Sequence, residues 1–178
     1  MAGCTLWFTG LSGAGKSTVS VLVARELEAR GHVVEVLDGD VVRTHLSRGL
    51  GFSRADRDAN IERIGWVASR LARAGAVVVV AAISPYAEAR ARARALTEAA
   101  GGTFLEVWVA TPLAECERRD PKGLYRRARA GDLAGMTGVD DPYEVPVAPD
   151  ITLDTAGETP AESAARLLVE LARRGLAG

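Results

Sequence analysis

Nine residues near the amino terminus constrain this chain more than any other stretch of its sequence. Residues 10–18 read Gly-Leu-Ser-Gly-Ala-Gly-Lys-Ser-Thr and match the pattern G-x-x-x-x-G-K-[ST]. In this pattern the glycines let backbone N–H groups turn toward phosphate oxygens, the lysine reaches the β- and γ-phosphates, and the hydroxyl meets Mg²⁺. The chain is therefore predicted to bind the phosphates of ATP or GTP.

The residues on either side of this phosphate loop support the same interpretation. An apolar, strand-like run at 4–8 leads into the loop, and apolar residues at 19, 22, 23 and 27 follow it with helical spacing. The loop thus ends at a helix N-terminus, where the partial positive charge favours phosphate. Lys16 is one of only two lysines among 22 basic residues. The alternative is a glycine-rich strand-to-helix turn in which the lysine is coincidental.

The length and composition of the chain favour a single compact domain that acts on a small molecule. With 178 residues, of which 48% are hydrophobic, we expect a single domain over 1–178 with a sizeable core. A net charge of −1 gives no general electrostatic case for nucleic acid or anionic membrane binding. The longest apolar stretch, 74–83, is too short to span a bilayer, and the first residues do not resemble a signal peptide. We therefore expect a cytoplasmic protein.

Valine-rich apolar runs recur along the chain and alternate with helical patterns. The runs lie at 5–9, 33–37, 77–83, 104–109 and 151–153, and the helices are predicted at 17–30, 54–74, 86–100, 112–119 and 160–174. This repeated alternation predicts an α/β fold with a parallel sheet. The run at 77–83 has no polar alternation, so it is predicted to be covered on both faces and to lie at the centre of the sheet.

A different composition separates the fourth and fifth predicted strands. Prolines and glycines mix with charged residues between 120 and 149, which is typical of an active-site lid. We place this lid at about 118–149. Its first part carries a basic cluster: Arg118, Arg119, Lys122, Arg126, Arg127 and Arg129. The alternative for this cluster is a solvated basic helix face.

Polar residues follow two further predicted strands. Asp38 and Asp40, separated by one glycine, come after the second strand, and Ser84 comes after the third. Ligands gather at the carboxyl ends of parallel strands, so these residues are expected near the nucleotide. One aspartate is suited to accept the proton of an acceptor hydroxyl and the other to hold Mg²⁺, and the sequence does not say which. A turn with Asp40 as a helix N-cap is the structural alternative.

Seven ordered motifs together resemble the adenylylsulfate kinase family. They are 8–18 (FTGLSGAGKST), 37–40 (LDGD), 50–53 (LGFS), 55–57 (ADR), 83–86 (ISPY), 122–125 (KGLY) and 141–144 (DPYE). The resemblance implies a P-loop NTPase fold of the nucleoside-monophosphate-kinase type. This fold has three α/β/α layers, a parallel five-stranded sheet with helices on both faces, and a lid. It also implies a homodimer that uses ATP with Mg²⁺ to phosphorylate the ribose 3′-hydroxyl of adenosine 5′-phosphosulfate (APS), as part of sulfate assimilation.

The resemblance also assigns roles to individual residues. The resemblance assigns ATP binding to Gly10, Leu11, Ser12, Gly13, Ala14, Gly15, Lys16, Ser17, Thr18 and Arg118. It also assigns Ser17 as a ligand of the metal. Substrate binding falls to Asp38, Asp40, Arg43, Phe52, Arg57, Asn60, Ile83, Ser84, Lys122 and Leu124. The residues implied in catalysis are Lys16, Asp38, Asp40 and Ser84. The ring of Phe52 is suited to stack on adenine, and the guanidinium groups of Arg43 and Arg57 are suited to bind the phosphosulfate. The alternative is that Phe52 is a buried core residue.

Ser84 is the residue for which the resemblance and the physical argument differ. The matching serine of the family has been assigned as a phosphoserine intermediate, but covalent catalysis needs an adjacent base, and none lies near Ser84 in sequence. A serine before a proline after a strand is instead typical of a helix N-cap. We therefore expect Ser84 to be a cap or a wall of the pocket, and phosphoryl transfer to be direct.

Two other functions remain as alternatives. A P-loop kinase for another small acceptor, a sugar acid or a nucleoside monophosphate, would keep Lys16, Ser17 and the lid. A nucleotide-dependent switch or binding module would bind nucleotide without acceptor turnover. A GTPase of that class would need an N-K-x-D motif, which the chain does not contain, because its only asparagine is Asn60.

Overall fold

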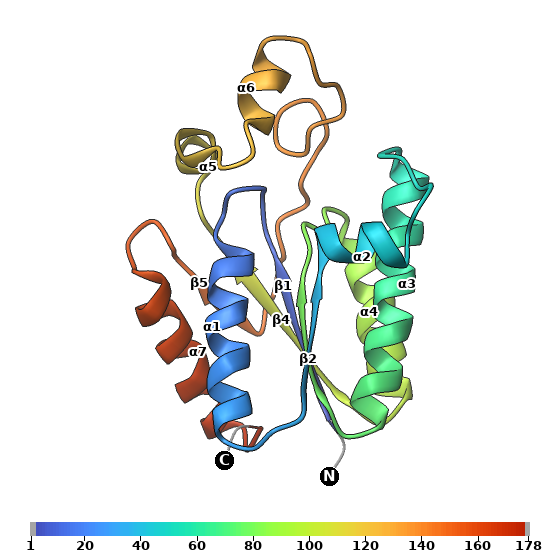
Figure 1. Cartoon of the computed structure of the whole chain (residues 1–178), viewed down its shortest axis with the longest axis vertical. Coiled ribbons are helices and arrows are strands. Elements are labelled where there is room, and N and C mark those ends of the chain that lie inside the picture. The colour runs from blue at the N-terminus through green and yellow to red at the C-terminus, as the bar shows by residue number, and fades with distance from the viewer. Residues whose placement is uncertain (1–2, 177–178) are drawn as a thin grey trace.

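The computed structural model describes residues 3–176 and contains one five-stranded parallel sheet (Figure 1). The strands stand in the order β2-β3-β1-β4-β5. In chain order the elements are β1 (Cys4–Thr9), α1 (Lys16–Ala29), β2 (Val34–Asp38), α2 (Gly39–His45), α3 (Arg54–Arg73), β3 (Val77–Ala81), α4 (Ala87–Ala99), β4 (Thr103–Val109), α5 (Leu113–Arg119), α6 (Leu124–Arg129), β5 (Ile151–Leu153) and α7 (Pro160–Arg173). Within residues 3–176, no helix is long and apolar enough to cross a membrane.

Helices cover both faces of the sheet, which gives three layers (Figure 1). Helices α1 and α7 lie on one face, and α3 and α4 lie on the other. Successive side chains of a strand point to opposite faces. Accordingly, Val77 and Val79 pack in the core beneath α1 and α7, whereas Val78 and Val80 pack in the core beneath α3 and α4. The sequence prediction of a strand covered on both faces is confirmed.

The five predicted strands are confirmed, and the predicted helices lie within a few residues of the observed ones. The run at 77–83 was predicted to be wholly strand at the centre, but β3 ends at Ala81 and β1 is the middle strand. The hydrophobicity of a strand indicates whether helices cover its two faces. The position of the strand in the sheet depends instead on the crossover connections between strands. Two short helices, α2 and α6, were not among the predicted helices.

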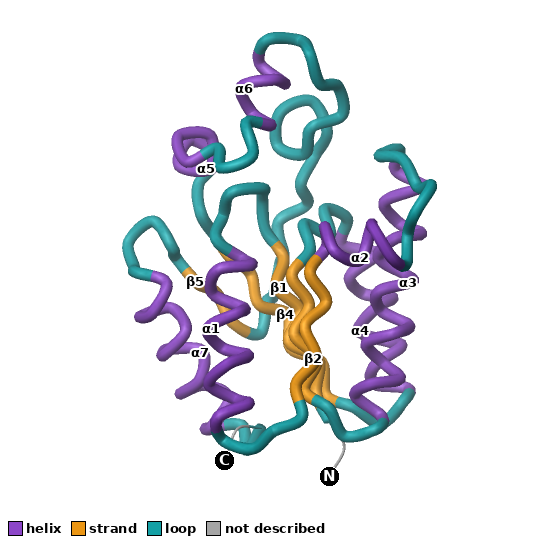
Figure 2. The backbone as a smooth tube through the Cα atoms, viewed as in Figure 1, coloured by secondary structure: helices purple, strands orange, loops and turns teal. Residues whose placement is uncertain are grey.

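The segment from α5 through α6 and the loop after it rises above the carboxyl ends of the strands, and the chain then runs back down beside the sheet to β5 (Figure 2). In this conformation it is fastened to the body by hydrogen bonds from buried or partly buried side chains. The Tyr125 hydroxyl donates to the Ser12 carbonyl at 2.9 Å, and the Tyr86 hydroxyl donates to the Asp141 carboxylate at 3.0 Å. The segment therefore lies over the phosphate loop in the position expected of a lid.

Candidate active site

A cavity of about 810 Å³ lies at the carboxyl ends of the strands, between the phosphate loop, α2, α3 and the lid. Most of the residues expected at the site line it: Ser12, Gly13, Gly15, Lys16, Ser17, Thr18, Asp38, Asp40, Arg43, Phe52, Arg57, Asn60, Ile83, Ser84, Lys122 and Leu124. Gly10, Leu11, Ala14 and Arg118 do not line it. Segments that are far apart in the sequence thus meet in one cavity, because parallel strands end at the same edge of the sheet.

The phosphate loop holds Lys16 at the base of this cavity. Left-handed backbone angles at Gly13 (φ 74°) and Gly15 (φ 101°) turn the chain tightly into α1, and these angles favour glycine. The Lys16 ammonium is buried and donates to the carbonyls of Gly10 at 2.9 Å and Leu11 at 2.7 Å. Burial lowers the pKa of Lys16 from 10.5 to about 8. A phosphate anion in the loop would supply the countercharge that this ammonium lacks.

The two aspartates at the end of β2 have different surroundings. One Asp38 carboxylate oxygen accepts from the Ser17 hydroxyl at 2.6 Å, and the other accepts from the Asp40 N–H at 3.0 Å. Asp38 is therefore the N-cap of α2, and the alternative that gave this role to Asp40 is wrong. The exposed Asp40 carboxylate instead forms an ion pair with Lys122 of the lid. The lid thus contacts the site through Asp40, one of the residues expected in catalysis.

A further wall of the cavity presents an aromatic ring close to two arginines. Phe52 is 65% exposed, so the alternative that made it a core residue is wrong. The guanidinium carbons of Arg43 and Arg57 lie 4.4 Å and 5.8 Å from its ring centroid. Arg57 also donates to the Thr137 hydroxyl at 2.5 Å and to the Gly135 carbonyl, which ties the lid to this wall. An anion and an aromatic base are the ligands that such a wall suits.

Asn60 of α3 adds an unused polar group to the same wall. Its side chain is only 5% exposed, and its Oδ1 atom is buried without a hydrogen-bond partner. Buried polar atoms are normally hydrogen-bonded, so an orphaned oxygen at a cavity wall points to a ligand donor. An amino or hydroxyl group of a bound molecule would satisfy it.

Ser84 lies in a strained turn after β3 and does not cap a helix. The N-cap of α4 is Tyr86, so the predicted capping role of Ser84 is wrong. Its backbone has a φ of 42°, which is uncommon for a residue other than glycine, and this angle turns the side chain toward the core. The Ser84 hydroxyl accepts from Trp7 Nε1 at 3.0 Å and donates to the Ala82 carbonyl at 3.3 Å. Neither partner is a base that could activate a nucleophile.

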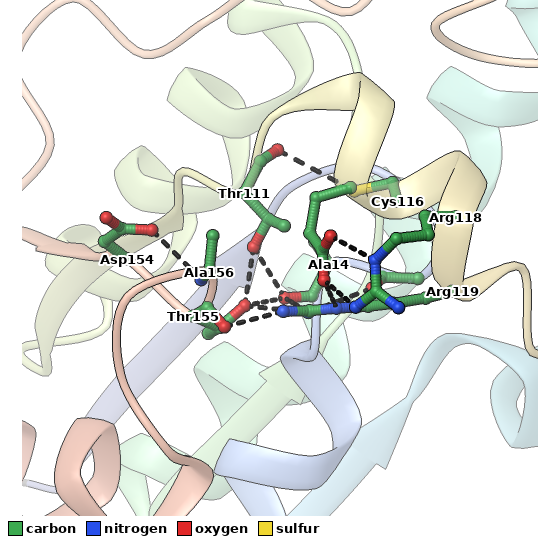
Figure 3. Close-up of polar contacts among 10 residues, drawn as sticks. Ala14, Thr111, Cys116, Arg118, Arg119, Asp154, Thr155 and Ala156 are labelled. Atoms are coloured by element: carbon green, nitrogen blue, oxygen red, sulfur yellow. Dashed lines mark hydrogen bonds and ion pairs between the residues drawn. The ribbon is translucent and has the colours of Figure 1, made fainter.

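The arginine nearest the phosphate loop is Arg119 rather than Arg118. Arg118 is paired with Glu115 on the exposed side of α5, whereas Arg119 lines the cavity. The Arg119 guanidinium reaches the Thr155 carbonyl at 2.6 Å and its hydroxyl at 3.0 Å (Figure 3). Thr155 and its neighbour Thr111 were not predicted from the sequence. Their only sequence signal is that each follows the end of a predicted strand.

A phosphate loop between β1 and α1, a parallel sheet with helices on both faces and a basic segment over the same cavity are the features of a P-loop kinase. Proteins with low sequence identity share this fold. A sugar kinase from Janibacter sp. aligns with a TM-score of 0.64 at 19% identity over 96% of this chain and 95% of that one.

Within this class the chain belongs to the adenylylsulfate kinase family. Residues 2–154 match the family model described as adenylylsulphate kinase. An adenylyl-sulfate kinase of Picosynechococcus sp. is 53% identical over 97% of this chain and 96% of its own length. One from a Synechococcus sp. is 54% identical over 97% of both chains. A Mycobacterium tuberculosis APS kinase solved with AMPPNP and APS aligns with a TM-score of 0.92 at 50% identity, over 96% of this chain and 98% of that one.

Proposed function

We propose that this chain transfers the γ-phosphoryl group of ATP to the 3′-hydroxyl of APS, giving 3′-phosphoadenosine 5′-phosphosulfate and ADP. The observation that carries the proposal is the single cavity that joins the phosphate loop to the wall of Phe52, Arg43 and Arg57. The loop suits the donor phosphates, and the wall suits an acceptor with both a base and an anionic group.

We propose that transfer is direct. The acceptor 3′-oxygen forms the new bond to the γ-phosphorus, the bond to the bridging oxygen of ADP breaks, and the hydroxyl proton leaves to a carboxylate. Asp40 is the better candidate for that carboxylate, because both oxygens of Asp38 already accept hydrogen bonds, whereas one oxygen of Asp40 accepts, from Lys122. The partners of the Ser84 hydroxyl, an indole N–H and a carbonyl, also support transfer without a phosphoserine.

The residues beside the phosphate loop fit Mg²⁺. Ser17 and Asp38 offer a hydroxyl and a carboxylate oxygen side by side, which are the hard oxygen donors that Mg²⁺ prefers. Among residues 3–176 there is no cluster of three or more His, Cys, Asp or Glu side chains for a metal. Mg²⁺ usually retains several waters and is shared with phosphates rather than caged by protein. When bound, it neutralises charge on the β- and γ-phosphate oxygens.

The lid has a separate part in the proposed reaction. Lys122 is held on Asp40, and Arg57 is held on the lid loop, so the lid spans the donor and acceptor sides. Its closure would exclude water from the γ-phosphate and so limit ATP hydrolysis. We place this lid at about 118–149 within a single domain over 1–178. Limited proteolysis with and without substrates tests its boundaries.

Product detection tests the proposed function. The chain is incubated with labelled ATP, Mg²⁺ and APS, and the 3′-phosphorylated nucleotide is separated from other products. Lys16→Ala serves as the inactive control, and gluconate and AMP serve as competing acceptors. A label found only in the APS product supports the proposal. No APS product, or faster labelling of gluconate or AMP, contradicts it.

We further propose a cytoplasmic homodimer that serves sulfate assimilation. Exposed apolar side chains support an oligomer: Leu46 and Trp66, 39% and 57% exposed, border a hollow of about 440 Å³. One relative, from Thiobacillus denitrificans, is described as a hexameric APS kinase, and this chain covers 30% of its length. Sedimentation velocity distinguishes a dimer from a monomer or hexamer, and cell fractionation tests the location.

A further inference from the structure

Two threonines that the proposed reaction does not use lie side by side near the phosphate loop. Strands β4 and β5 are paired with Val109 opposite Leu153, and Thr111 and Thr155 each follow two residues later. The register of the sheet therefore brings the two together. Their hydroxyl oxygens are 2.6 Å apart, and the residues are only 5% and 7% exposed.

Both hydroxyls reach the same acceptor, the carbonyl of Ala14 in the phosphate loop (Figure 3). The distances are 2.9 Å from Thr111 and 2.6 Å from Thr155. Each hydroxyl has one proton, and Arg119 also donates to the Thr155 oxygen at 3.0 Å. Either threonine can thus donate to Ala14 while the other donates to its neighbour. The carbonyl keeps a donor in both arrangements.

Fixing this carbonyl also fixes a phosphate-binding amide. The Ala14–Gly15 peptide is trans, so the Ala14 C=O and the Gly15 N–H point in opposite directions. A carbonyl held on the threonine side directs the N–H away from the threonines, and Gly15 lines the cavity. Thr155 also packs against Gly15, since a Cβ added to Gly15 would meet three Thr155 atoms at 3.3–3.6 Å.

We propose that Thr111 and Thr155 are positioning residues that hold the Ala14–Gly15 peptide so that the Gly15 N–H faces the nucleotide phosphates. They act through the backbone and touch no reacting atom. The inference rests on the proposed function, since it assigns these phosphates to the ATP donor. Arg119, which donates to Thr155, links the same peptide to the beginning of the lid.

The test uses valine, which has the shape of threonine but no hydroxyl. Single variants Thr111→Val and Thr155→Val should change ADP affinity less than about threefold, because the remaining hydroxyl still donates to Ala14. The double variant leaves the carbonyl only the long contact from Arg119, at 3.5 Å, so its ADP affinity should fall by about tenfold or more. The double serine variant, which restores both hydroxyls, should bind ADP like the unchanged chain.

A second buried threonine pair provides the matched control. Thr5 and Thr97 are fully buried, with hydroxyl oxygens 3.4 Å apart, and neither lines the cavity. Their double valine variant should keep the ADP affinity of the unchanged chain. In kinetic assays the Thr111/Thr155 double valine variant should raise the KM for ATP and leave the KM for APS unchanged. A general loss of packing would raise both.

Calorimetry with ADP and amide NMR decide the proposal. Unchanged ADP affinity in the folded double valine variant, or no recovery with serine, would overturn it. In ¹⁵N-glycine-labelled protein, the double valine variant should shift the Gly15 amide resonance more than that of Gly65 on α3. An unmoved Gly15 resonance in the double variant would also overturn the proposal. So would a single valine variant with ADP affinity lowered by tenfold or more, and this result does not need the double variant to fold. If the proposed function is wrong, the unchanged chain will bind ADP but form no product from APS, and this result is distinct from those that would overturn the role of the threonines.

Discussion

The hydrogen bond between Trp7 and Ser84 offers a sharp test of how phosphoryl transfer occurs. Ser84→Ala removes the acceptor of the Trp7 indole N–H, which lies 3.0 Å from the Ser84 oxygen in a side chain that is 0% exposed. Leaving a buried donor unsatisfied costs about 1–3 kcal/mol. Alanine and serine tolerate a φ of 42° about equally poorly, so the substitution hardly changes the backbone strain.

The expected result is therefore a loss of stability without a loss of chemistry. For a chain of this size, 1–3 kcal/mol corresponds to a melting temperature lowered by about 2–12 °C. The turnover number should stay within about tenfold of the unchanged chain, because the Ser84 hydroxyl has no base beside it and direct transfer does not need it. Thermal unfolding and a steady-state product assay measure the two effects.

A double-mutant cycle separates the hydrogen bond from other effects of the substitution. In a Trp7→Phe background the indole donor is gone, so Ser84→Ala should cost about 1 kcal/mol less than it does alone. Turnover reduced by several orders of magnitude, with folding and binding of both substrates intact, would refute direct transfer. A phosphorylated Ser84 in a quenched reaction would refute it as well.

Three further predictions concern the acceptor wall, the base and the lysine. Phe52→Ala should raise the KM for APS by about 5- to 150-fold, the value of one base–aromatic stack, and barely change stability, since Phe52 is 65% exposed; steady-state kinetics check this, with the exposed Val33→Ala as control. Asp40→Asn should lower turnover by about 10²- to 10⁴-fold, the usual contribution of a general base, with little change in ADP affinity by calorimetry; an unchanged turnover would reject Asp40 as the base. The pKa of Lys16, about 8 when nucleotide is absent, predicts ADP binding that weakens above pH 8 and takes up a proton there. Because this pKa lies below the 10.5 of the unfolded chain, the penalty for burying the ammonium is present below pH 8 and is relieved between about pH 8 and 10.5. Calorimetry in buffers of different ionisation enthalpy measures the proton, and Lys16→Ala should abolish its uptake.

Local sequence signals predicted most of the fold and the donor half of the site. The phosphate loop, Lys16 and the covered strand β3 depend on glycines and apolar spacing that act over a few residues, so they can be read without tertiary information. The sequence did not predict the short helices α2 and α6 or the unusual backbone conformation of Ser84. Ser84 was expected to cap a helix or to form a wall of the pocket; it lines the cavity but caps no helix, because its left-handed conformation is not indicated by its sequence.

The sequence by itself determined the class of this protein, because the phosphate loop and the alternation of apolar strands with helices are patterns set by residues close together in the chain. Tertiary structure decided which polar groups share the cavity and what each is free to do. The register of β4 and β5 joined Thr111 to Thr155, and the N-cap of α2 together with the Ser17 hydroxyl engaged the two oxygens of Asp38, whereas Asp40 pairs with the lid. These relations depend on distances between segments that are remote in the chain, and packing alone sets such distances.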